Sequence, residues 1–256
     1  MSAEADAAAA KSGVVIRELH EIQEFEAAFR LFDDIWHPEP GSPPVPVELM
    51  ITFAHSGNYV AGAFEGDTMV GASVGFLAAG EALHSHVTGA SIGRGIGSAL
   101  KLHQRDWALE RGLKRIVWTF DPLVRRNARF NLVKLGARPE EYLERFYGAM
   151  ADAINEGDEP DRLLAVWRLT EPPPPYPSTT PVIGLAEVDG RPVHGSTDGR
   201  LVLVATPADI EALRREDPWT AKAWRAAMRE TLGGLMAEGA HVVGFTGEGQ
   251  YVVSRE

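Results

Sequence analysis

The stretch SIGRGIGSALK, residues 91–101, places glycine at every second position and then turns at once into a helix-forming run. Glycine lets main-chain N–H groups approach a ligand closely, and a helix N-terminus attracts anions through its dipole and its unpaired donors. The amides from Arg94 to Ser98 therefore predict a cradle for a diphosphate.

Two common nucleotide motifs do not fit this stretch. A Rossmann fingerprint needs G-x-G-x-x-G with an acidic residue about 20 positions further on, whereas Gly93, Gly95 and Gly97 alternate strictly. A P-loop needs Gly-Lys-Ser/Thr, which the stretch lacks. The loop is therefore a different kind of phosphate site.

Two histidines precede the loop on the expected strand LHSHVTG, residues 83–89. Because side chains alternate along a strand, His84 and His86 share one face. An imidazole with a pKa of about 6.5 can accept a proton near neutrality. We take His86 as the first candidate for a general base and His84 as the second, and packing in the core is the alternative for either one.

Asp121 stands at the end of the next expected strand, residues 114–122, and Arg125 and Arg126 follow it at the start of a helix. Asp121 could bind a cationic substrate, orient a histidine or cap the helix that follows. Arg125 and Arg126 either contact the charge of a phosphorylated adenosine or form a solvated pair.

Other catalytic classes find little support. His84 and His86 form H-x-H without an obvious third ligand, so no metal is expected. The serines at positions 73, 85 and 98 lie outside any G-x-S-x-G elbow, which argues against a serine hydrolase.

The composition excludes several partners. A net charge of −11 without a basic run disfavours nucleic acid and anionic lipid, and no apolar run approaches the ~20 residues of a membrane span. The absence of cysteine excludes disulfides and thiolate chemistry, and the N-terminus does not have the pattern of a signal peptide. We therefore expect a cytoplasmic protein.

Hydrophobic periodicity and turn residues predict an alternation of strands and helices. Phe25, Phe29, Phe32 and Trp36 mark an amphipathic helix, and EGDT joins two strands of a hairpin. The expected domains are a disordered N-terminus (1–13), an α/β domain (14–171), a proline-rich linker (172–182) and a smaller C-terminal α/β unit (183–256). The tail repeats the helix, glycine, strand pattern of the first domain's second half, which suggests a partial, degenerate copy.

The chain resembles the GNAT superfamily of coenzyme A-dependent N-acyltransferases. Gly95 and Gly97 match the glycines of the family's diphosphate loop and Arg94 matches the position between them, while Ile92 stands where the family has Gln or Arg. In RRNARFNLVKLGA, Ala128, Lys134 and Gly136 match a second motif, with its Asn displaced to Asn127 and Leu132 in place of the frequent general-acid Tyr.

The resemblance covers residues 14–169, with a weaker likeness in the tail. It implies a mixed, mostly antiparallel α/β (α+β) sheet flanked by helices and splayed at the strand of residues 83–89. Main-chain groups of Val87 and Gly89 would meet the pantetheine amides. The residues expected to bind the nucleotide are Val87, Thr88, Gly89, Arg94, Gly95, Ile96, Gly97, Ser98, Ala99, Arg125 and Asn127.

The function that the resemblance implies is transfer of an acyl group from acetyl-CoA or another acyl-CoA to the amine of a small molecule by direct attack. His86, His84 and Asp121 are the catalytic candidates. Two alternatives remain open: another reaction on the same fold, such as acyl transfer to a different nucleophile or decarboxylation of an acyl-CoA, and a non-catalytic CoA-binding regulator. The tail could cover the acceptor cleft or form a homodimer surface, and the sequence does not choose between them.

Overall fold

The structure, a computed structural model, describes residues 2–38, 42–91, 93–148, 158–172 and 178–256. It divides into two compact units, Met1–Val117 and Trp118–Glu256. The boundary between the units falls inside a strand, upstream of the proline-rich stretch that was expected to separate the domains. Part of that stretch, residues 173–177, lies outside the described residues.

The first unit is built on a sheet in the order β1-β2-β3-β4-β5. Strands β1 to β4 are antiparallel neighbours, and β4 pairs in parallel with the start of β5. The strands are β1 Val15–Glu18, β2 Tyr59–Glu65, β3 Thr68–Ala78, β4 Ala82–Ala90 and β5 Arg115–Phe120. The mixed, mostly antiparallel sheet of the sequence-based prediction is confirmed.

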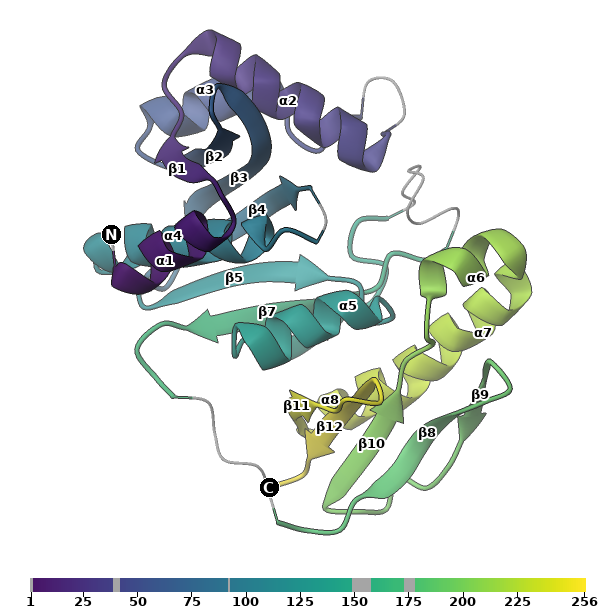
Figure 1. Ribbon diagram of the computed structural model, residues 1–256. Helices are drawn as coiled ribbons and strands as arrows, with labels where there is room; N and C mark the ends of the chain where they lie inside the picture. The colour runs from purple at the N-terminus through teal and green to yellow at the C-terminus, as the bar shows by residue number, and fades with distance from the viewer. Residues whose placement is uncertain (1, 39–41, 92, 149–157, 173–177) are drawn as a thin grey trace. The chain divides into compact units, whose positions relative to one another are not determined.

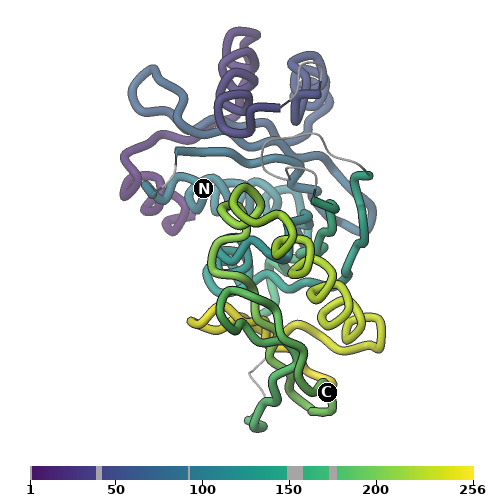
Figure 2. The backbone as a smooth tube through the Cα atoms, turned by 90° about the vertical axis from the view of Figure 1, so that its right-hand side faces the viewer, coloured from purple at the N-terminus to yellow at the C-terminus, as the bar shows by residue number. Residues whose placement is uncertain are grey.

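Helices cover both faces of this sheet (Figures 1 and 2). On one face, α2 (Ile22–Trp36) and α3 (Val47–His55) bury Phe25 and Phe32 of the expected aromatic stripe against β2 and β3. On the other face, α4 (Ile96–Glu110) buries Ile96 and Leu100 against Ala63 of β2. The glycine-rich loop between β4 and α4 is therefore tied to a packed helix at one end and a sheet strand at the other.

The N-terminal segment departs from the prediction of disorder, because it forms helix α1, Ala3–Lys11. Its apolar character is weak, but Ala5 is buried and the helix packs on α4. Tertiary contacts therefore stabilise a helix whose own sequence pattern did not indicate one.

The second unit holds the end of β5, followed in the sheet order by β7 (Arg162–Arg168) and β6 (Arg138–Leu143). Between β5 and β6 lie the short helix α5 (Arg125–Ala128) and the π-helix η1 (Arg129–Lys134). The expected helix at 124–135 is thus present, and its second half is wound more widely than an α-helix.

The tail of the second unit forms a five-stranded sheet in the order β11-β12-β10-β8-β9 (Figure 1). Its strands are β8 Val182–Val188, β9 Arg191–His194, β10 Leu201–Ala205, β11 His241–Phe245 and β12 Gln250–Ser254. Its helices are α6 Ile210–Glu216, α7 Pro218–Met228, the π-helix η2 Arg229–Gly233 and α8 Gly234–Ala237.

This tail repeats the topology of the chain's earlier half. The order β8-β10-β12-β11 corresponds to β4-β5-β7-β6, and the first pair is parallel and the last antiparallel in both. In the first copy the helical segment before β6 contains the π-helix η1, and in the second the segment before β11 contains the π-helix η2. Each segment is followed by a left-handed glycine, Gly136 at φ 76° and Gly239 at φ 89°. The strand order supports the interpretation of the tail as a partial copy of the first domain.

Candidate functional site

Strand β4 contains a β-bulge at His86. Its register with β3 pairs Ser85 with Gly75 and Val87 with Val74, so one residue of β4 has no partner opposite it. A bulge of this kind bends a strand, locally disrupts its ladder and re-aims a side chain. The bulged residue is the one that we selected as the first candidate base.

The two histidines of β4 lie close together, as the alternation predicted. Their ring centroids are 6.4 Å apart, and His84 stacks on Phe76 at 4.8 Å with an interplanar angle of 18°. Burial lowers the pKa of His84, and the charges of His86 and Lys101 lower it further. His84 is therefore neutral at neutral pH and able to accept a proton.

His86 is exposed, and its Nε2 lies 3.0 Å from the carbonyl oxygen of Pro44. Because a carbonyl oxygen only accepts, Nε2 donates in this bond, and in the neutral ring the lone pair lies on Nδ1. The contact orients the ring and leaves a basic nitrogen free for a substrate, the arrangement that a general base needs.

The residues after the bulge have distinct roles in the fold. Thr88 Oγ1 lies 2.7 Å from Ser73 Oγ on β3. A Cβ on Gly89 would stand 2.7 Å from the Trp36 ring, so α2 needs a glycine there. Because Val87 and Gly89 are two positions apart, their main-chain groups point to the same edge of β4. Their contact with a pantetheine arm stays a prediction.

The loop that follows has the backbone of an anion site. Gly93 has φ 87°, and Gly95 forms the N-cap of α4 at φ 79°, a left-handed conformation that favours glycine. The first turn of a helix exposes N–H groups without intrahelical acceptors, and these groups face the ligand in anion sites. The loop thus presents the amides of the first turn of α4, as predicted, although Ile92 lies outside the described residues.

Fewer main-chain amides are available to bind a diphosphate than the sequence predicted. The Ser98 and Ala99 amides donate to the Gly95 carbonyl at 3.0 and 3.1 Å, because α4 has already begun. The side chains of Ile96 and Ala99 are buried in the core. The predicted role of the Ser98 and Ala99 amides is therefore corrected, and the remaining candidates are the amides of residues 94–97.

Among the described residues nothing requires glycine at position 97. Its φ is not positive, and a Cβ built on it would meet none of their atoms within 4 Å. Elsewhere in a helix, glycine is less favourable than alanine by about 0.5–1 kcal/mol. The space beside the Gly97 backbone in the first turn of α4 would allow a ligand to approach closely.

The Arg94 side chain braces the loop. Its Nη1 donates to Glu65 Oε2 at 2.7 Å, and its Nη2 donates to the Ser12 carbonyl at 3.4 Å. The side chain therefore holds the loop against Glu65 and Ser12, and the main-chain amide of Arg94 stays a candidate donor to an anion.

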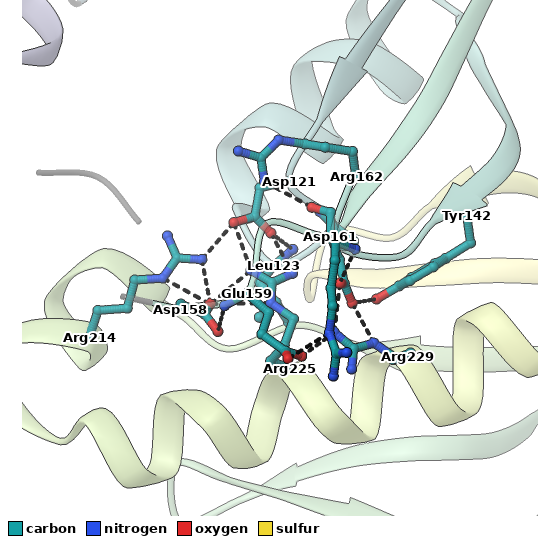
Figure 3. A network of polar contacts seen from close by, with 12 residues as sticks. Asp121, Leu123, Tyr142, Asp158, Glu159, Asp161, Arg162, Arg214, Arg225 and Arg229 are labelled. Carbon is teal, nitrogen blue, oxygen red and sulfur yellow. Dashed lines mark hydrogen bonds and ion pairs between the residues drawn. The ribbon is translucent and has the colours of Figure 1, made fainter. Parts of the chain in front are cut away.

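Asp121 does not have the catalytic position that we expected. It is buried in the second unit, where Arg214 Nη2 and Arg225 Nη2 approach Oδ2 at 2.6 and 2.9 Å (Figure 3). Its Oδ1 accepts from the Leu123 amide at 2.9 Å and from Arg225 Nη1 at 3.0 Å. Both oxygens are engaged, so Asp121 anchors the turn before α5, which corrects the prediction of a substrate-binding or histidine-orienting carboxylate.

Asp121 belongs to a buried ionic cluster that the sequence analysis did not anticipate. Asp158 Oδ2 accepts from Nη2 of Arg214 and from Nη2 of Arg225, each at 2.9 Å (Figure 3). Burial alone would raise the pKa of Asp121, but the charges of Arg225 and Arg214 outweigh this and hold it far below its usual value. We name Asp121, Asp158, Arg214 and Arg225 the ionic cluster.

The residues that were expected near the adenosine are partly engaged elsewhere. Arg125 donates from Nε to Thr206 Oγ1 and from Nη2 to Glu187 Oε2, both at 3.1 Å. Arg126 pairs with Glu211 and its side chain is 61% exposed, as the alternative of a solvated surface residue expects, whereas Arg125 is half-buried. Asn127 is exposed on α5. Contact of Arg125 and Asn127 with a nucleotide stays a prediction.

A buried lysine beneath β4 escaped the sequence analysis. Lys101 Nζ donates to Ser85 Oγ at 2.7 Å and to Gln104 Oε1 at 3.3 Å, and burial lowers its pKa to about 7. The alternation along β4 that places the two histidines on one face places Ser85 on the other. This was the one feature of the sequence that could have indicated a polar partner such as Lys101 beneath the strand. Leu132, at the position of the family's usual acid, is buried in η1 and supplies no proton.

The described residues contain neither a cluster of potential metal ligands nor a helix that could span a membrane. No group of three or more potential metal ligands gathers there. None of the helices in that part of the chain is long and apolar enough to cross a membrane.

Solved structures share this architecture. One match is Ard1 from Thermoplasma volcanium, with a TM-score of 0.50 and 15% identity over 62% of this chain and 99% of that chain. Another is a structure from Desulfovibrio desulfuricans assigned to the GNAT family of acetyltransferases, with a TM-score of 0.50 and 18% identity over 61% of this chain and 99% of that chain. No protein-family model matches the sequence. No curated protein matches it significantly. The protein therefore has the GNAT fold, which accounts for about three fifths of its length.

Proposed function

We propose that the protein transfers an acyl group, most simply acetyl, from an acyl-CoA to the amine of a small molecule by direct attack. The observation that carries the proposal is the sequence of a bulged β4, a loop of left-handed glycines and the open first turn of α4. The GNAT fold supports acyl transfer in general, and the site residues suggest the details.

The residues of the loop fit a CoA diphosphate. The main-chain amides of residues 94–97 and the dipole of a 15-residue helix favour an anion, and space lies open beside Gly97. When bound, the thioester supplies an activated acyl group.

Proton transfer falls to the histidines of β4. An amine must lose a proton to attack, and His86 offers an oriented ring with a basic Nδ1. His84, kept neutral by burial, lies within 6.4 Å of it, ring to ring, and is the second candidate. The net charge of −11 would attract a cationic acceptor by electrostatic steering.

The apolar residue at position 132 favours a second candidate function. Leu132 is 3% exposed and leaves the thiolate without the usual acid. A CoA-binding protein that decarboxylates an acyl-CoA, or that only senses the ligand, releases no thiolate and needs no such acid, whereas acyl transfer to another nucleophile still releases one.

Calorimetry with CoA and acetyl-CoA, followed by measurement of thiol release with a panel of amines, tests these functions. The proposal expects binding, turnover with at least one amine, and a His86→Ala variant that binds CoA but turns over at least about 100-fold more slowly. Tight binding without turnover on any amine would favour the second candidate. Absence of heat with CoA and with its thioesters would overturn both.

A further inference from the structure

Helix α1 lies along α4 and is attached to it near both ends (Figure 1). At its start, Ser2 Oγ donates to Asp106 Oδ1 at 3.0 Å, and Glu4 Oε2 accepts from Arg105 Nη2 at 2.8 Å. At its end, the Ser12 carbonyl accepts from Arg94. Since Asp106 lies in the C-terminal half of α4 and Arg94 just before its N-terminus, the two helices are antiparallel.

The C-cap of α1 therefore meets the glycine-rich loop. Ser12 Oγ lies 3.2 Å from the point where a Cβ on Gly95 would stand, beside the N-cap of α4. Glu65 on β2 holds the Arg94 guanidinium that bonds to the Ser12 carbonyl. The position of Ser12 beside the loop is thus fixed from two directions.

The Ser12 hydroxyl has no partner within the part of the chain that the structure describes. The residue is only 8% exposed, and the hydrogen bonds among the described residues include its main-chain groups but not its hydroxyl. The hydroxyl oxygen is not among the side-chain atoms that are buried without a partner, so it remains accessible to a ligand that binds at the loop. This hydroxyl stands at a helix N-terminus, where anions bind.

We infer that Ser12 donates a hydrogen bond to an anionic oxygen of the diphosphate held by the loop, so that α1 is part of the coenzyme site. This inference rests on the proposed function. It assigns a ligand contact to a segment that precedes the first strand of the sheet, which the glycine motif does not include.

The test compares Ser12→Ala with Ser56→Ala, because Ser56 is also a helix C-cap serine of the first unit, at the end of α3. Dissociation constants are measured by ligand-dependent thermal shift for two probes, CoA and pantetheine, which lacks the diphosphate. A hydrogen bond to a charged oxygen predicts that Ser12→Ala weakens CoA binding about tenfold or more and leaves pantetheine binding unchanged. Ser56→Ala should change neither constant.

The outcomes separate the inference from the proposed function. Equal CoA affinity of wild type and Ser12→Ala, or an equal loss for both probes, would overturn the inference while leaving the function intact. Failure of the wild-type protein to bind CoA would overturn the proposed function and the inference with it. Deletion of residues 2–12 provides a second test. Weaker binding of CoA with unchanged binding of pantetheine would support the inference, and equally weaker binding of both probes would oppose it.

Discussion

Gly97→Ala should affect the binding of CoA and the stability of the fold in opposite directions. A Cβ at this position meets no atom of the part of the chain that the structure describes within 4 Å, and the backbone is not left-handed. Alanine is favoured over glycine in helices by about 0.5–1 kcal/mol. The variant should therefore be as stable as the wild type or more stable, with a melting temperature that rises by roughly 1–3 °C.

The same methyl group should obstruct a diphosphate that rests on the backbone of the first turn. Inserting a methyl group into a filled contact typically costs about 1–3 kcal/mol. We therefore expect the dissociation constant for CoA to increase at least about tenfold, which corresponds to about 1.4 kcal/mol. Calorimetry measures the affinity, and urea unfolding measures the stability.

Gly234→Ala is the matched control. Gly234 is also a helical glycine with nothing within 4 Å of its Cβ position, but it lies in α8 of the second unit. It should gain similar stability and keep full CoA affinity. If Gly97→Ala gained stability and bound CoA as tightly as the wild type, the open space beside Gly97 would not be a ligand surface and the reasoning would be refuted.

Three further predictions concern charge. The pKa of Lys101 is about 7 in the folded protein against 10.5 ordinarily, so the unfolded chain binds more protons between these values. The contribution of Lys101 to the free energy of unfolding should therefore rise by about 2 kcal/mol from pH 7 to pH 9. Lys101→Met should lack this contribution, and urea titrations of both proteins at several pH values measure the difference. If His84 is the base, its lowered pKa places the acidic limb of the kcat/KM profile below pH 6.5, and a limb above that value would eliminate it. Arg225→Leu should reduce the free energy of unfolding by about 3–5 kcal/mol, because it removes one of the two guanidinium groups that pair with the buried carboxylates Asp121 and Asp158. Asp121→Leu combined with Arg225→Leu removes one charge of each sign and should be less damaging than Arg225→Leu alone; additive losses of the two single changes in denaturant titrations would contradict this.

The parts of the fold that could be read from the sequence are those with local signals. The alternation of β4 and the start of α4 directly after the glycines are each set by a few neighbouring residues, and the structure confirms them. The bulge at His86 has no such signal, because it is defined by the register of β4 against β3.

Helix α1 and the role of Asp121 were mispredicted for a related reason. The sequence of α1 is rich in alanine and has no marked apolar face, so its fixed position depends on Asp106 and Arg105, about 100 positions away. Asp121 is followed by proline and lies at a strand end, which suits a cap or a ligand equally well. The choice was made by Arg214 and Arg225, 93 and 104 positions downstream.

The ionic cluster also explains why the chain does not divide at its proline-rich stretch. The two carboxylates belong to the GNAT-like part, on either side of β6, and the two guanidinium groups belong to α6 and α7 of the tail (Figure 3). All four side chains are nearly inaccessible to water. A carboxylate buried without a partner is far more unfavourable than a buried pair, so these carboxylates can stay buried only while the guanidinium groups of the tail accompany them. The cluster therefore ties the tail to the part of the unit that contains β6 and β7, whatever further role its surface has.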